Sequence, residues 1–133
     1  MVKIADLKIS SRKENIVDVE TLVESLRIQF ELNDTKYHNM LLASVEAVNN
    51  AIEHGNNSDE DKNVYISAIR CETTLKLSIK DEGRGFNPDK LPDPTCGKFL
   101  EQPDGRGVFL IRQLADEVAF LDGGTRIEMK FRL

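Results

Sequence analysis

The amino-acid sequence predicts an α+β fold, a two-layer α/β sandwich in which three helices cover one face of a mixed, mostly antiparallel sheet. Two consecutive segments, residues 13–32 and 35–55, carry apolar residues at helical spacing. Segments that alternate apolar and polar residues cluster later in the chain as two hairpins, which is typical of this architecture. Because the chain has 133 residues and 40% apolar content, we expect residues 1–133 to form a single domain.

The composition excludes several classes of partner. The net charge is −5 and no basic run is present, so we expect no nucleic-acid partner. No apolar stretch approaches the roughly 18 residues of a membrane span, and residues 1–6 lack the apolar centre of a signal peptide. Cys71 and Cys96 stand alone, which indicates neither a disulfide framework nor a zinc site. These features fit a cytoplasmic protein without a membrane partner.

The first part of the chain is expected to form a strand followed by two helices. Residues 2–10 predict a strand, and Ser10 or Ser11 is suited to cap the helix that follows. The apolar stripe of residues 13–32 lasts less than three heptads, which favours packing on a sheet over a coiled coil. After a short break, residues 35–55 predict a second helix, because Gly and Asn follow its last apolar residue.

Four further strands are expected in two hairpins. Residues 64–68 and 75–80 each place apolar residues on one face, so they predict an antiparallel hairpin with one buried face. Residues 118–120 and 127–131 predict the second hairpin, with Asp122-Gly123-Gly124 as its turn.

A long segment separates the two hairpins. Residues 87–104 contain all four prolines and little periodicity, so we expect a lid or a binding loop. Gly105-Arg106-Gly107 ends this segment, and a helix that begins with Val108 is expected to follow.

The helix predicted over residues 35–55 has two different faces. An apolar stripe runs along it, and a polar stripe is displaced from this by one residue. The apolar stripe consists of Leu41, Val45, Val48 and Ile52, and the polar stripe of Glu46, Asn50, Glu53 and Asn57. Glu46 and Asn50 lie one above the other, and a carboxylate paired with an amide oxygen suits a hard cation or a polar ligand. A solvated helix face is the alternative that this helix alone leaves open.

Four short motifs follow one another in an order that resembles the GHKL ATPase superfamily, which shares the Bergerat fold. They are Glu46-x-x-x-Asn50, Asp81-x-Gly83-x-Gly85-Phe86, Gly105-x-Gly107 and Gly124-Thr125. Residues 46–55, 81–86 and 105–111 look most like one small bacterial branch, the anti-sigma-factor serine kinases of the RsbW and SpoIIAB type. Each glycine motif alone is weak evidence, but four motifs in order on suitable elements are strong evidence.

The resemblance assigns one group of residues to the base of ATP. Asp81 corresponds to the carboxylate that accepts a hydrogen bond from the adenine amino group. Gly83 and Gly85 would let the backbone approach the base closely, because they lack side chains. Thr125 corresponds to the position whose hydroxyl supports the adenine and Asp81.

A second group is assigned to the phosphates and the metal. Asn50 corresponds to the ligand of Mg²⁺, and Glu46 to the general base that accepts a proton from the attacking hydroxyl. Asn49 would be a further nucleotide contact. Gly105, Arg106 and Gly107 would cradle phosphate oxygens at a helix N-terminus, although such a pair of glycines can also be a plain turn.

Other residues keep two interpretations. Arg84, Lys98 and Arg106 are either phosphate contacts or solvated side chains, and His54 fits a structural role at the helix end better than that of a phosphoacceptor. No P-loop motif is present in the sequence.

The resemblance implies an ATP-dependent serine/threonine protein kinase with ATP and Mg²⁺ as cofactors. Its substrate would be a small STAS-domain anti-anti-sigma protein, its target a sigma factor or a similar protein, and its assembly a homodimer. Two alternatives remain: a nucleotide-gated module that sequesters a partner without phosphotransfer, and a plain ATPase regulator whose acceptor is water.

Overall fold

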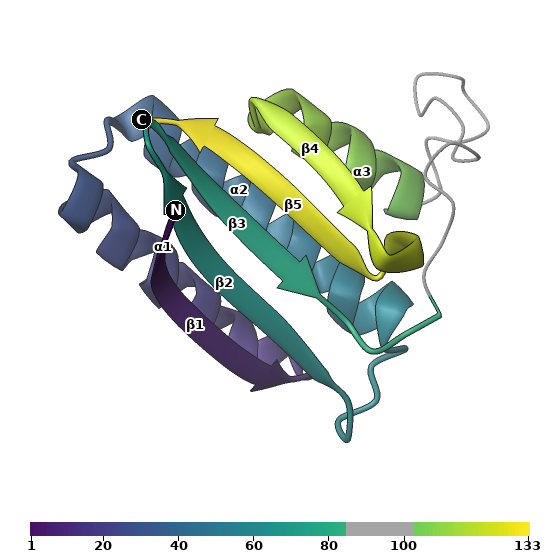
Figure 1. Cartoon of the computed structure of the whole chain (residues 1–133). Helices are drawn as coiled ribbons and strands as arrows, with labels where there is room; N and C mark the ends of the chain where they lie inside the picture. Colours follow the sequence, from purple (N-terminus) through teal and green to yellow (C-terminus); the bar gives the residue numbers. More distant parts are fainter. Residues whose placement is uncertain (85–102) are drawn as a thin grey trace.

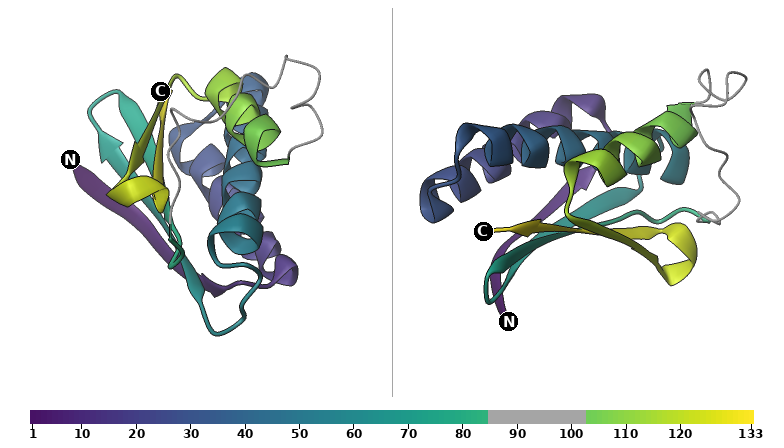
Figure 2. Two further views of the ribbon diagram at one scale, coloured as in Figure 1. Left: turned by 90° about the vertical axis from the view of Figure 1, so that its right-hand side faces the viewer. Right: turned by 90° about the horizontal axis from the view of Figure 1, so that it is seen from above.

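The computed structural model describes residues 1–84 and 103–133 and has two layers, a sheet and a layer of helices on one of its faces (Figures 1 and 2). The elements are β1 (Val2–Ser10), α1 (Ile16–Phe30), α2 (Asp34–Asn50), β2 (Asn63–Cys71), β3 (Thr74–Lys80), α3 (Pro103–Leu114), β4 (Glu117–Leu121) and β5 (Arg126–Arg132). The predicted two-layer α+β sandwich is therefore confirmed.

The sheet has five strands in the order β1-β2-β3-β5-β4. All four pairings among these described strands are antiparallel, so the sheet lacks the mixed arrangement that the sequence predicts. The two predicted hairpins form as β2–β3 and β4–β5. Strand β5 then pairs with β3, which brings the end of the chain to the middle of the sheet (Figure 1).

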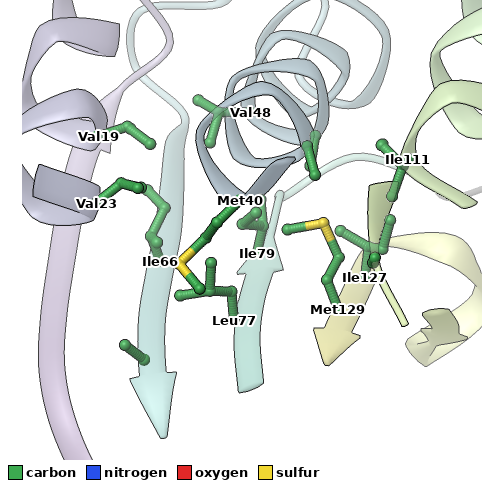
Figure 3. Close-up of a cluster of buried hydrophobic side chains, with 14 of the residues drawn as sticks. Val19, Val23, Met40, Val48, Ile66, Leu77, Ile79, Ile111, Ile127 and Met129 are labelled. Atoms are coloured by element: carbon green, nitrogen blue, oxygen red, sulfur yellow. The ribbon is translucent and has the colours of Figure 1, made fainter. Parts of the chain in front are cut away.

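The core lies between the sheet and the helices, where side chains from both layers interdigitate (Figure 3). Helix α2 contributes Met40 and Val48, which are fully buried, whereas Leu41 and Val45 of the predicted apolar stripe are only half-buried. The small side chains of Ala43 and Ala47 complete the buried face of α2. The helix is thus rotated slightly from the predicted orientation, because small residues allow its backbone to lie close to its neighbours.

The junction between β1 and α1 differs from the prediction that Ser10 or Ser11 caps the helix. The hydroxyl of Ser11 is buried and donates to the Lys62 carbonyl at 2.7 Å. Arg12 occupies the N-cap of a 3-10 turn, Lys13–Asn15, without a side-chain hydrogen bond to the turn. The serine hydroxyl is therefore used to join two distant segments of chain.

Helix α2 begins as its sequence predicts and ends differently. The Asn33 side chain accepts a hydrogen bond from the Lys36 backbone amide at 2.8 Å and caps the helix. The last turn, Ala51–Gly55, is π-helical, and the Asn56 backbone amide donates to the Ala51 carbonyl at 2.8 Å. Single π-helical turns within helices are frequent at functional sites.

Helix α3 begins earlier than the sequence predicts. It starts at Pro103, so the segment Gly105–Gly107 lies within its first turns and not before it. Proline suits the first turn of a helix, because its missing N–H would have no partner there. The lid predicted at residues 87–104 lies outside the described residues up to residue 102, and its last two residues belong to α3. Among the described helices, none is long and apolar enough to cross a membrane.

Candidate functional site

A pocket of about 280 Å³ lies between the helix layer and one end of the sheet. Its lining comes from α2 and the π-helical turn (Ala47, Asn50, Ala51, His54, Gly55), from α3 (Val108, Ile111), from the strands and their ends (Ile79, Asp81, Phe120, Gly124, Thr125, Ile127), and from Asn57 and Arg84. Seven of these residues are apolar and six are polar, and the polar ones converge from several elements. Such a concave, mainly apolar pocket with a few placed polar groups is typical of a small-molecule site.

Asp81 follows β3 directly and lies on the wall of this pocket. Its backbone amide donates to the Thr125 carbonyl at 2.9 Å, and its Oδ1 accepts from the Gly83 backbone amide at 2.7 Å. The residue is only 8% exposed. Among the described residues, none donates to Oδ2, so this oxygen is available to a donor on a ligand.

Burial raises the pKa of the Asp81 carboxyl above its ordinary value, because a low-dielectric environment disfavours the charged form. The hydrogen bond from Gly83 and the positive charges of Lys80 and Lys62 oppose this rise. A perturbed carboxyl in a pocket is a candidate functional group, since structural carboxylates are seldom buried without a cationic partner.

Two glycines bring the backbone close to Asp81. A Cβ added at Gly55 would overlap the Asp81 carboxylate, and one added at Gly83 would overlap the Gly55 carbonyl oxygen. Gly83 thus lies close to the Gly55 backbone, and its predicted approach to a base stays a prediction. The absence of both side chains allows the π-helical turn and the segment after β3 to meet.

Asn50 and Gly107 meet where α2 packs against α3. Asn50 lines the pocket, and a Cβ added at Gly107 would lie 2.7 Å from the Asn50 Nδ2 atom. Glu46 is half-buried and lies one helical turn before Asn50, outside the pocket lining. Residues four apart on a helix have Cβ atoms about 5–6 Å apart, so the Cβ of Glu46 lies near that of Asn50, beside the lining of the pocket.

Thr125 lines the pocket, and the nucleotide contacts expected of Thr125 and Asn49 stay predictions. The Thr125 hydroxyl donates to the Asp122 carbonyl at 2.9 Å, and it is the Thr125 backbone carbonyl that holds Asp81. Asn49 is half-buried and does not line the pocket. His54 lies on the pocket wall, although the sequence favours a structural role for it.

The remaining predicted residues fall in the segment before and at the start of α3. Gly85 and Lys98 lie outside the described residues. Gly105 and Arg106 belong to the first turn of α3, which starts at Pro103. Arg84, one of the candidate cations, lines the pocket.

The sequence interpretation missed Asn56 and the apolar wall of the pocket. Asn56 is fully buried and hydrogen-bonded to three segments of the chain. Its partners are 7 to 45 residues away in the sequence, so no local pattern indicates them. The apolar wall includes Ile79, Ile111 and Phe120, which the sequence shows only as core residues of three separate elements.

Residues 9–131 match the family described as the histidine kinase-like ATPase domain. Because this match covers nearly the whole chain, the chain belongs to that family. The family resemblance predicted from the four motifs is therefore confirmed.

The chain is also similar to individual proteins whose names are known. The chain is 38% identical over 92 residues to proteins named anti-sigma F factor from Bacillus cytotoxicus and Bacillus thuringiensis. The match covers 63% of this chain and 61% of each relative, so the chain spans about three fifths of their length.

The fold is similar to that of a crystal structure of the RsbU and RsbW domains of a Mycobacterium tuberculosis protein. The TM-score is 0.68 at 18% sequence identity, and the similarity covers 98% of this chain and 33% of that chain. At this identity the similarity concerns the fold alone.

Proposed function

We propose that the protein is an ATP-dependent serine/threonine protein kinase of the anti-sigma-factor type. The observation that carries this proposal is the buried Asp81 carboxylate on an apolar pocket, with Asn50 on the same pocket one helical turn after Glu46. Membership of the histidine kinase-like ATPase domain family supports ATP as the nucleotide.

The pocket fits the base of ATP. An apolar wall that includes Ile79 and Ile111 suits a flat aromatic ring, and the Oδ2 of Asp81, which accepts from none of the described residues, suits the exocyclic amino group of adenine. Guanine presents a carbonyl oxygen at that position, which would face a carboxylate oxygen without a proton between them. Asp81 would therefore select adenine over guanine.

The residues present also fit a magnesium ion that is held mainly by the nucleotide. In the described part of the chain, no group of three or more His, Cys, Asp or Glu side chains could hold a metal. A cation at this site would depend on phosphate oxygens and water, with the Asn50 amide oxygen as the ligand from the chain. Such an ion would neutralise charge on the phosphates during transfer.

Glu46 would handle the proton in the transfer step. A serine or threonine oxygen of the partner forms a bond to the γ-phosphorus, the bond to the β–γ bridging oxygen breaks, and the hydroxyl proton passes to the Glu46 carboxylate. Transfer of this kind relies on positioning and electrostatic stabilisation, and a single base at the edge of the pocket meets that need.

We assign the partners of this chain by analogy with the proteins to which it is similar. Proteins named anti-sigma F factor support a sigma factor or a similar protein as the target of this chain. The substrate would be a small STAS-domain protein, which competes with the target until it is phosphorylated. We also propose a homodimer and a cytoplasmic location.

Replacement of Glu46 by glutamine tests the assigned base. We expect Glu46→Gln to keep its affinity for Mg-ATP and to lose phosphoryl transfer by about 10²–10⁴-fold, because glutamine cannot accept the proton. Glu53→Gln is the matched control, since Glu53 lies about two helical turns after Glu46 and pairs with Lys13 at 2.7 Å. Equal transfer rates in Glu46→Gln and the wild type would remove Glu46 from this role.

Capture from a lysate of the source cell tests the activity as a whole. Partners are captured on the wild type and on Glu46→Gln in the presence of Mg-ATP, and their phosphosites are mapped by mass spectrometry. We expect one phosphoserine or phosphothreonine on a small protein, absent with the variant. Partners without a phosphosite would favour a nucleotide-gated sequestration module, and ATP turnover without any partner would favour a plain ATPase regulator.

A further inference from the structure

Asn56 lies at the centre of a buried polar junction beneath the pocket. It follows the π-helical turn directly and is 0% exposed. Its Nδ2 donates to the Ser11 hydroxyl at 2.9 Å and to the Asn63 carbonyl at 3.0 Å. Its Oδ1 accepts from the Glu82 backbone amide at 2.7 Å. The amide thus joins the end of β1, the start of β2 and the segment after β3.

The bond to Glu82 holds the residue next to Asp81 in the chain. Three successive backbone amides are each fixed by a different acceptor. Those of Asp81, Glu82 and Gly83 donate to the Thr125 carbonyl, the Asn56 side chain and the Asp81 carboxylate, respectively. Of these three acceptors, only the Asn56 side chain connects residues 81–83 to the chain that follows α2. The position of the carboxylate therefore depends on Asn56 as well as on the strand before it.

Two further hydrogen bonds stabilise this junction. The Asn63 backbone amide donates to the Glu82 side chain, and Ser11 donates to the Lys62 carbonyl at 2.7 Å. Both polar atoms of the Asn56 amide are hydrogen-bonded to other segments of the chain, and Asn56 does not line the pocket. An effect of this side chain on a ligand can pass through Glu82 to Asp81, or through the chain neighbours Gly55 and Asn57, which line the pocket.

We propose that Asn56 is a positioning residue for recognition of the base, which it serves by fixing the backbone that carries Asp81. This inference rests on the proposed function, because it takes Asp81 as the partner of an adenine amino group. Removal of Asn56 leaves the Glu82 amide without its acceptor, and the segment can then shift to satisfy that amide elsewhere. A small displacement of a binding group is enough to weaken a directional hydrogen bond.

Base selectivity separates positioning from general stabilisation. The test measures the dissociation constants of Mg-ADP and Mg-IDP by calorimetry, since inosine carries an oxygen in place of the adenine amino group. For Asn56→Ala we expect the preference for ADP over IDP to fall by about tenfold, the worth of one hydrogen bond to a charged group. The affinity for IDP should stay close to that of the wild type.

Ser11→Ala is the matched control. It removes hydrogen bonds from the same buried junction but leaves the bond between Asn56 and Glu82 in place. We expect it to lower thermal stability and to keep the full preference for ADP. If Asn56→Ala does not fold, Asn56→Ser replaces it, because its shorter side chain cannot reach the Glu82 amide.

Two results would overturn the proposal in distinguishable ways. If the Asn56 variants weaken ADP and IDP equally and keep the wild-type preference, Asn56 is only a structural tie and the proposed function stands. If the wild type itself binds IDP as well as ADP, recognition of adenine by Asp81 fails, and the role of Asn56 fails with it.

Discussion

The burial of Asp81 carries a structural cost, which its proposed binding role would explain. Its carboxyl is buried, and the lysines near it only oppose the effect of burial on its pKa. Evolution of a core for stability alone would favour a neutral side chain here, because a buried charge without a direct partner is unfavourable. The burial of this carboxyl is therefore consistent with a hydrogen-bond acceptor for a donor on a ligand.

Replacement of Asp81 by asparagine should separate these two effects. Asparagine can still accept from the Gly83 amide but presents no carboxylate, so we expect Asp81→Asn to fold and to lose the nucleotide-induced shift in melting temperature. Without nucleotide, its free energy of unfolding at neutral pH should equal or exceed that of the wild type, since the buried charge is gone. Thermal melts with and without Mg-ADP measure both quantities.

The pH dependence of stability has a defined sign at Asp81. Because its folded-state pKa is raised, the folded protein binds more protons than the unfolded chain from about pH 3.9, the ordinary pKa of Asp, up to the region of the raised folded-state pKa. The Asp81 contribution is therefore fully present below that pH and is lost as the pH rises through the raised folded-state pKa.

Denaturant titrations at pH values from below about 3.9 upward measure the free energy of unfolding. With rising pH, this free energy should fall less steeply for Asp81→Asn than for the wild type. Asp122→Asn is the control, because Lys80 lowers the pKa of that exposed carboxyl and its contribution has the opposite sign. An unchanged pH profile in Asp81→Asn would contradict this account of the Asp81 carboxyl.

Helices α2 and α3 meet at the site, where the α3 backbone lies close to a side chain of α2. Gly107 lies in the second turn of α3, against the Asn50 side chain. Glycine within a helix costs about 1 kcal/mol relative to alanine, so its presence there is explained by the space that Asn50 needs.

Gly107→Ala should therefore move the Asn50 amide. The gain in helix propensity and the overlap with Nδ2 oppose each other, and we expect a net loss of stability of up to about 2 kcal/mol. Displacement of an assigned metal ligand should reduce the Mg²⁺-dependent part of nucleotide affinity by roughly 10–100-fold. Titrations of ADP with and without Mg²⁺ measure this part directly.

Gly123→Ala is the comparison for that variant. A Cβ at Gly123 meets nothing within 4 Å, but the backbone has a φ of +69° that an alanine rarely adopts. We expect a loss of about 1 kcal/mol from backbone strain with no change in the Mg²⁺ dependence. If both variants changed that dependence equally, the contact between Gly107 and Asn50 would not explain it.

The molecule as a whole builds one pocket from segments that are distant in the chain. Strand β3, the β4–β5 hairpin and the two helices α2 and α3 all contribute side chains to it. A ligand in this pocket contacts both layers, so it should stabilise the described sheet and helices together.

Calorimetry can test this coupling of ligand binding to global stability. At ADP concentrations 100 times the dissociation constant, the free energy of unfolding should rise by about 2.7 kcal/mol through mass action. We expect a single transition that shifts as a unit, because the core is continuous between the layers. Two transitions, only one of which responds to ADP, would show that the pocket belongs to a separate unfolding unit.

Local patterns account for the elements and for part of the site. Helical and alternating spacings are properties of neighbouring residues, so they predict the helices and both hairpins. Val48 of a predicted helix and Phe131 of a predicted strand are buried as expected. Asn50 belongs to the polar stripe that the helical spacing predicts, whereas Asp81 was assigned by the resemblance to the GHKL ATPase superfamily. Both line the pocket.

Contacts between distant segments account for the rest. The sequence suggests Ser11 as a helix cap, but its hydroxyl bonds to Lys62. It suggests the Thr125 hydroxyl as the support of Asp81, but the Thr125 carbonyl holds that residue. The role of Asn56 has no sequence signal at all. A hydrogen-bond partner far along the chain is chosen by the packing of layers, and that packing is a property of three-dimensional proximity rather than of neighbours in sequence.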